Sequence, residues 1–407
     1  MTARRNLSPN PSPGLPANGA RSLAHHGERP PEDMAALHAS VSLRRGRFAL
    51  DITLDAPAGV TALLGPSGAG KSLTLQAIAG LTPISVGRVT LNGRTLEDTA
   101  AGVNLPPRLR RVGYVPQNYA LFPHLSVAGN IAYGLDRGLD RAAREKRVAE
   151  LLALGRLAGY EARRPRDLSG GEAQRVAVLR ALAAEPEALL LDEPFSALDA
   201  PTRAAVRDDL GALIAVSGLP AVLVTHDLSE ALALAGRLAL LVEGRVAVAG
   251  PAAEALATPP TLGAARLLGW TAALAVAGYV MEGGATRLTL PGGQTLTLDG
   301  SSVAPGILER PVARVALAVR PERLLIGRAG PGDADGADGG AGPCALRGTL
   351  ASGADGAPER VTLDGGAEPL RLALAPREWV GLGLTAGDVV TLRPLPGALR
   401  LVVEETS

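Results

Sequence analysis

A glycine-rich octapeptide that ends in a lysine and a serine is the strongest chemical feature of the sequence. It follows the pattern G-x-x-x-x-G-K-[ST] and consists of Gly65, Pro66, Ser67, Gly68, Ala69, Gly70, Lys71 and Ser72. Glycines let the backbone curl so that successive N–H groups face phosphate oxygens, and a helix N-terminus adds a favourable dipole. We expect Lys71 to reach the β- and γ-phosphates of ATP and the Ser72 hydroxyl to bind Mg²⁺.

Two adjacent acids form the second chemical feature. Asp192 and Glu193 follow the apolar run Ala188–Leu191, which reads as a buried strand. Asp192 is placed to hold Mg²⁺, directly or through water, and Glu193 to polarise an attacking water as the general base. Alone, these residues would be ordinary acids at the end of a strand, but after a phosphate loop they predict nucleotide hydrolysis.

The elements around these residues predict an α/β domain. Residues 59–64 read as a buried strand before the phosphate loop, and residues 73–81 read as a helix that Thr82 and Pro83 end. Strand-like and helix-like runs alternate from Leu37 to about Leu256, which is typical of a largely parallel sheet.

A third motif, L-S-G-G-E-A-Q-R over residues 168–175, lies between the phosphate loop and the acids. Ser169 and Glu172 fit a capping box, so by itself the motif indicates only the start of a helix. The motif also resembles the signature peptide of ABC ATPases. Its family positions here are Leu168, Ser169, Gly170, Gly171 and Glu172.

The resemblance to this family covers about residues 37–256 and gives roles to further residues. Gln117 resembles the glutamine that senses Mg²⁺ and the attacking water, and completes an implied Mg²⁺ set of Ser72, Gln117 and Asp192. Asp199 resembles the aspartate of the loop that crosses the dimer interface, and His226 the histidine that contacts the γ-phosphate. The implied cofactors are ATP and Mg²⁺.

The expected adenine contact departs from the family pattern. The family stacks an aromatic ring on adenine some twenty residues before the phosphate loop, where Phe48 is the one nearby aromatic residue. Phe48 is either that ring, supplemented by Arg45, or a core residue of a strand. The sequence leaves both interpretations open.

The family mechanism implies a homodimer, because the signature peptide of one subunit meets the ATP on the phosphate loop of the other. The implied partners are integral membrane permease subunits and, through them, a periplasmic or extracellular substrate-binding protein. The expected location is therefore the cytoplasmic face of the bacterial inner membrane.

The segment L-F-P-H-L-S-V over residues 121–127 narrows the substrate class, because it resembles the corresponding segment in importers of oxyanions, ferric iron, polyamines and sugars. Residues 59–66, 93–105 and 105–107 together look most like the molybdate or tungstate subgroup. Sulfate, ferric iron and polyamine import remain alternatives. A soluble ABC ATPase without a transport role is a remote alternative, since the chain has one set of motifs and no heptads.

The last third of the sequence predicts an all-β domain. Residues 287–298 and 360–372 both read as hairpins, and residues 316–321 and 389–394 echo each other at about the same spacing. The segment resembles a TOBE/Mop-like, OB-type barrel, a resemblance that implies a site for an oxyanion, with Arg377 and Thr385 as weak candidates. The predicted division is a disordered leader over 1–35, the ATPase domain with a helical subdomain over 36–256, a linker over 257–272 and a β domain over 273–407, with two related repeats over about 273–326 and 344–404.

The bulk composition excludes several other classes. The net charge of +1 and an aromatic content of 2% argue against a nucleic-acid partner. A single cysteine, Cys344, excludes an internal disulfide and a cysteine-rich metal site. No window approaches eighteen uncharged apolar residues, and no apolar stretch follows Arg4 and Arg5 as in a secretory signal.

Overall fold

The computed structural model describes most of the chain from residue 36 onward. The described residues are 36–196, 198, 200–304, 307, 314–329, 345–352, 358–363, 370–371 and 383–404. The predicted leader, Cys344, Asp199 and Arg377 lie outside them. The described residues fall into two compact units, one made of residues 36–62, Gly70–Thr225 and Ala233–Gly236 and the other of Leu63–Ala69, His226–Leu232 and the described residues from Arg237 onward. Within the described residues, no helix is both long and apolar enough to cross a membrane.

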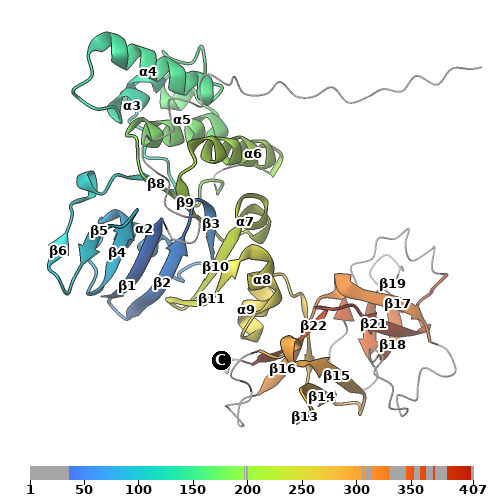
Figure 1. Cartoon of the computed structure of the whole chain (residues 1–407). Coiled ribbons are helices and arrows are strands. Elements are labelled where there is room, and N and C mark those ends of the chain that lie inside the picture. Colours follow the sequence, from blue (N-terminus) through green and yellow to red (C-terminus); the bar gives the residue numbers. More distant parts are fainter. Residues whose placement is uncertain are drawn as a thin grey trace, which may run out of the picture. The chain divides into compact units, whose positions relative to one another are not determined.

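An antiparallel group of strands opens the first unit. Its members are β1 (Leu37–Arg45), β2 (Phe48–Ala56), β4 (Val86–Leu91), β5 (Arg94–Asp98) and β6 (Val103–Asn104). They lie in the order β6-β5-β4-β1-β2 (Figure 1). In β1, buried and partly exposed residues alternate because one face of the strand packs on the core.

A second group of strands includes the buried strands that the sequence predicts. β3 (Gly59–Leu64) lies beside β9 (Pro220–Thr225), which lies beside β8 (Ala188–Asp192) and then β7 (Val112–Val115). β7, β8 and β9 run parallel, and every residue of β8 and β9 is buried. Strands buried on both faces read as continuous apolar runs, and this is why the sequence shows them so clearly.

Helices cover these strands and build the predicted helical subdomain. They are α2 (Lys71–Ala79), α3 (Val127–Tyr133), α4 (Arg141–Leu154), α5 (Gly170–Ala183) and α6 (Ala200–Ser217), with short 3₁₀ turns η1 (Pro107–Leu109) and η2 (Pro165–Asp167). Figure 1 shows α3, α4 and α5 gathered together, and their buried side chains share one core with β8, β9 and α6.

The second unit contains the β10–β11 hairpin, short helices and the strands of the β domain. Its first elements are α7 (Leu228–Leu234), β10 (Arg237–Val242), β11 (Arg245–Pro251), α8 (Ala252–Ala257) and α9 (Leu262–Leu267). The strands of the β domain are β12 (Ala272–Ala275), β13 (Gly278–Glu282), β14 (Ala285–Thr289), β15 (Thr295–Asp299), β16 (Val315–Val319), β17 (Leu324–Arg328), β18 (Leu346–Ser352), β19 (Pro358–Leu363), β20 (Leu370–Arg371), β21 (Val389–Pro394) and β22 (Leu399–Val403), with 3₁₀ turns η3 (Gly300–Ser302) and η4 (Pro321–Arg323).

The segment predicted as a linker, residues 257–272, is folded against the β domain. The indole N–H of Trp270 donates to the Leu256 carbonyl over 3.0 Å, and the Arg320 guanidinium lies 4.5 Å above the ring. The buried Arg400 donates to the Pro259 carbonyl over 2.9 Å. Trp270 is 1% exposed, so the segment contributes to the core of the second unit.

Both hairpins predicted in the β domain are present. β14 pairs with β15, and β19 pairs with β20. The two echoing segments form β16 and β21, and each is followed by one more strand, β17 and β22. β16 pairs with β22 while β17 pairs with β21, so strands of the two predicted repeats pair with each other.

Candidate active site

Parallel strands deliver the predicted catalytic residues to one edge of the sheet. β7 ends at Val115, two residues before Gln117, and β8 ends at Asp192, next to Glu193. The register pairs Val115 with Leu191 and Asp192 with Val224. The carboxyl ends of parallel strands meet at one edge, where ligands bind in open α/β sheets. His226 is the first residue after β9.

Gly70 joins the phosphate loop to α2, and any other residue at this position would be strained. Gly70 is the N-cap of α2 with φ 105°, and Gly68 in the same loop has φ 82°. A Cβ on Gly70 would lie 2.8 Å from Leu50 Cδ1 and 2.9 Å from Phe48 Cζ. Only glycine combines this φ with so close an approach of neighbours.

Lys71, the first residue of α2, is only 5% exposed, and its Nζ lies 3.8 Å from Glu193 Oε1. Burial lowers the pKa of Lys71, while the nearby charges of Glu193 and Asp192 oppose that shift. The amine therefore faces acids at the place where the sequence predicts nucleotide phosphates. A phosphate group that entered would compete with Glu193 for the same ammonium.

Asp192 accepts two hydrogen bonds on its two carboxylate oxygens. The Ser72 hydroxyl donates to Oδ1 over 2.8 Å, and the Tyr114 hydroxyl donates to Oδ2 over 3.1 Å. Burial raises the pKa of Asp192, and these two hydrogen bonds oppose the rise. Burial and the Asp192 carboxylate together raise the pKa of Tyr114 to about 12, so Tyr114 stays a donor.

The donor set at this point suits Mg²⁺. The Ser72 hydroxyl and the Asp192 carboxylate touch each other, and hard oxygen ligands completed by phosphates and water are what Mg²⁺ prefers. Among the described residues, no group of three or more His, Cys, Asp or Glu side chains could hold a metal unaided.

Glu193 is held in an unusual backbone conformation beside Gln117. Its φ is 43°, in the left-handed region, and its N–H donates to the Val224 carbonyl over 3.0 Å. Gln117 Nε2 donates to Glu193 Oε2 over 3.3 Å and to Ser196 Oγ over 3.2 Å. Non-glycine residues held at positive φ cost free energy and cluster at functional sites. The arrangement fixes the Glu193 carboxylate between Lys71 and Gln117.

The signature peptide opens α5 as the capping pattern predicts. The Ser169 hydroxyl accepts from the Glu172 N–H over 3.4 Å, and the Ser169 N–H donates to Glu172 Oε2 over 2.7 Å. Leu168 precedes the cap, and α5 begins at Gly170 and continues through Gly171. The first amides of α5 therefore form a helix N-terminus of the kind that binds anions.

Phe48 packs against the phosphate loop. It begins β2, pairs with Arg45 across the β1–β2 hairpin and is partly buried, with its ring in contact with Gly70. This contact suits a ring beside a bound nucleotide and equally a core residue that supports the loop. Adenine stacking therefore stays a prediction.

Two residues that support this site or its helix α2 have no role in the sequence motifs. One is Tyr114, which lies one residue before the end of β7 and reaches Asp192 only because β7 and β8 are neighbours. The other is Arg110, which is 1% exposed, pairs with Glu97 over 2.6 Å and donates to the carbonyls of Ala77 and Ile78 at the end of α2. The position of Tyr114, three residues before Gln117, could have indicated a role at the site, whereas no motif in the sequence indicated a role for Arg110.

The chain is similar to proteins of known function. Residues 50–196 match the family model described as ABC transporter. The Fe(3+) ions import ATP-binding protein FbpC of Pseudomonas fluorescens is 43% identical over 278 residues, which are 68% of this chain and 73% of that protein. The molybdenum import ATP-binding protein ModC of Paramagnetospirillum magneticum is 42% identical over 286 residues, 70% of this chain and 76% of that protein.

A solved structure of a dimeric bacterial ABC transporter cassette is 28% identical, with a TM-score of 0.45, over 53% of this chain and 98% of that chain. The identity and coverage of the sequence relatives are high enough to assign the family. The chain belongs to the ABC transporter family, as one of its ATP-binding proteins.

Proposed function

We propose that this chain is the ATP-hydrolysing subunit of an importer for molybdate or tungstate. The observation that carries the ATPase part is the meeting of the phosphate loop with two acids, Ser72 with Asp192 over 2.8 Å and Lys71 with Glu193 over 3.8 Å. The substrate is supported by the similarity to ModC proteins, one of which, from Mycobacterium tuberculosis, is 46% identical over 239 residues. The sequence resemblance to the molybdate or tungstate subgroup points the same way.

Iron or polyamine import is a second candidate for the same motor. FbpC of Pseudomonas fluorescens is 43% identical, and the spermidine/putrescine import ATP-binding protein PotA 1 of Pseudomonas aeruginosa is 42% identical over 268 residues. These identities lie as close as those of the ModC proteins. Substrate therefore has to be assigned by transport measurements.

In the proposed reaction, ATP lies on the phosphate loop with its phosphates toward the start of α2. Lys71 leaves Glu193 and pairs with the β- and γ-phosphates. Glu193, held in place by Gln117, then accepts a proton from the water whose oxygen bonds to the γ-phosphorus, while the bond from that phosphorus to the β-phosphate oxygen breaks and ADP and phosphate leave. Mg²⁺, held by Ser72 and Asp192 with Gln117 nearby, would neutralise charge that develops on the phosphate oxygens.

In the proposed dimer, each of the two ATP sites would be completed by residues of the other copy of the chain. The amides at the start of α5, behind the Ser169 cap, would face the γ-phosphate on the other subunit. Asp199 would cross the same interface and His226 would contact the γ-phosphate. ATP binding then closes the dimer, and hydrolysis removes the γ-phosphate contacts that hold it closed.

The dimer would act on the cytoplasmic face of the inner membrane. Its partners would be membrane permease subunits that move as the dimer opens and closes, and an external protein that delivers the substrate to them. The segment 120–130, which contains the start of α3, would receive the permease.

The β domain would act as a TOBE/Mop-like sensor of the imported anion. Support comes from its two repeats, whose closing strands pair crosswise as β16 with β22 and β17 with β21. Of the two weak anion candidates, Thr385 already donates its N–H to Asp388 Oδ2 over 2.8 Å, so an anion would have to replace that carboxylate. Anion binding that favours the open dimer would slow hydrolysis by linkage.

Reconstitution with the permease in proteoliposomes tests this function. ATP-dependent uptake of molybdate and tungstate, measured against sulfate, ferric iron and putrescine, should separate the substrates, with Glu193→Gln as the inactive control. Uptake of iron or putrescine alone would reject the oxyanion assignment. A missing ATPase activity in the wild-type complex would reject the motor role.

The sensor role is tested in the same proteoliposomes. Molybdate or tungstate at millimolar concentration on the β-domain side should slow hydrolysis by about fivefold to a hundredfold. A chain that ends after Leu256 should lose this response. The cut belongs there and not at 272, because Trp270 packs with the β domain. Equal responses of both chains would reject the sensor.

A further inference from the structure

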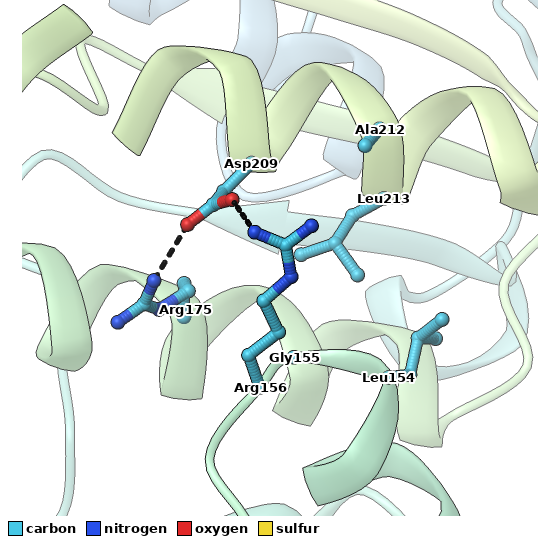
Figure 2. Close-up of a pocket in the computed structure, with 7 residues that line it drawn as sticks. All are labelled: Leu154, Gly155, Arg156, Arg175, Asp209, Ala212 and Leu213. Atoms are coloured by element: carbon cyan, nitrogen blue, oxygen red, sulfur yellow. Dashed lines mark hydrogen bonds and ion pairs between the residues drawn. The ribbon is translucent and has the colours of Figure 1, made fainter. Parts of the chain in front are cut away.

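One carboxylate on α6 joins two arginines from two other segments of the helical subdomain. Figure 2 shows Asp209 between Arg175, on α5, and Arg156, in the turn after α4. Arg175 Nη1 donates to Asp209 Oδ2 over 2.6 Å, and Arg156 Nη1 donates to Asp209 Oδ1 over 3.0 Å. Each carboxylate oxygen thus holds a different arginine.

The two bonds differ in how well they are sheltered from water. Arg175 and Asp209 have side chains 20% and 21% exposed, whereas Arg156 is 62% exposed. Exposed ion pairs contribute little, so the bond from Arg175 is the one that can fix geometry. The cavity between these side chains, about 10 Å³, holds at most one water. The cluster is therefore a joint between helices and offers no room for a ligand.

The joint connects the two helices whose starts matter most to the proposed function. Arg175 is the last residue of the motif at 168–175 and lies five residues after Gly170, the first residue of α5, so it stands within two turns of the start of that helix. α6 begins at Ala200, directly after Asp199 of the predicted interface loop. A charge-assisted bond between half-buried groups is short and directional, and it restrains the two helices relative to each other.

We propose that Asp209 is a positioning residue for the closed dimer. It holds Arg175 so that the start of α5 and the start of α6 meet the second subunit as one body. The inference rests on the proposed function, in which the signature peptide and Asp199 both lie at the interface with the partner's ATP. Asp209 itself touches no nucleotide.

The test measures ATP-dependent dimerisation of the full chain in a Glu193→Gln background, where hydrolysis does not dissolve the dimer. Asp209→Asn keeps the shape of the side chain but removes its charge. Asp208→Asn is the matched control, because Asp208 is the preceding residue of α6, is 74% exposed and pairs only weakly with Arg207. Asp209→Glu restores the carboxylate. Sedimentation gives the dimer constant, and a fluorescent ATP analogue titrated into dilute monomer gives nucleotide affinity.

We expect Asp209→Asn to weaken the ATP dimer by about fivefold to a hundredfold. Nucleotide affinity of the monomer should stay unchanged, and Asp209→Glu should recover part of the loss. A dimer as tight as that of Asp208→Asn would overturn the proposal. So would a loss of monomer nucleotide affinity equal to the loss of dimer, because that result indicates a general structural defect. If the background protein itself stays monomeric with ATP, the proposed dimer is wrong and the inference is overturned with it.

Discussion

Replacing Glu193 by Gln removes one charge and one proton acceptor while the size of the side chain is kept. Gln117 Nε2 now donates to Glu193 Oε2 over 3.3 Å, and an amide oxygen can accept the same bond. The site should therefore keep its shape and lose its base. A positioned general base contributes about 10²–10⁴ in rate, so hydrolysis should fall by that factor.

The same substitution should tighten ATP binding, because the Glu193 carboxylate competes with phosphates for Lys71. At the observed 3.8 Å, two unit charges attract by about 4 kcal/mol if the effective dielectric constant is about 20. Burial of Lys71, which lowers its pKa, offsets part of this attraction. We expect about 1–2 kcal/mol to appear as tighter binding, which is about 5–30-fold.

Two measurements on one protein preparation decide the question. Phosphate release in a single turnover gives the hydrolysis rate, and an equilibrium titration gives ATP affinity. Glu145→Gln makes the same chemical change in an exposed pair with Arg141 on α4 and should alter neither value. Turnover near that of the wild type would refute the base role of Glu193. Weaker ATP binding would refute the competition for Lys71.

Four further substitutions test the phosphate loop and its surroundings. Lys71→Ala should lower ATP affinity in a binding titration, because it removes the charge that faces the phosphates, and an unchanged affinity would contradict the phosphate-loop assignment. Phe48→Ala should raise the KM for ATP about fivefold or more if the ring stacks on adenine, whereas a lower melting temperature at constant KM would assign Phe48 to the core. Gly68→Ala should destabilise the protein by about 1–2 kcal/mol through backbone strain alone. Gly70→Ala should cost about 1–3 kcal/mol more, because its Cβ also meets Leu50 and Phe48. Equal losses of thermal stability in the two variants would refute this steric reasoning.

The predictable parts of the site are those whose sequence signal lies within a few consecutive residues. The run before Asp192 is apolar because β8 is buried on both faces, and the start of α5 shows in the spacing of Ser169 and Glu172. Signals of this kind depend on local periodicity and capping, which the sequence carries without any knowledge of neighbours.

The parts that escaped prediction depend on contacts between distant residues. Tyr114 and Asp192 are 78 positions apart, and Arg175 and Asp209 are 34 positions apart. The prolines of the segment 257–272 favour a linker, yet Trp270 packs there beneath the guanidinium of Arg320, which lies far along the chain. Charged and aromatic residues reveal such roles only when their partners are known.

The crosswise pairing of the two β repeats has a consequence for the origin and assembly of this domain. A single repeat would leave β16 and β17 as open sheet edges, which invite pairing with another chain. An ancestor with one repeat would therefore close the same sheets by exchanging strands with a second copy, as in a domain-swapped dimer. Fusion of two copies turns that association into an intramolecular one, governed by effective concentration in place of protein concentration. Deletion of one predicted repeat would expose sheet edges of the other, so the two should fold and unfold together.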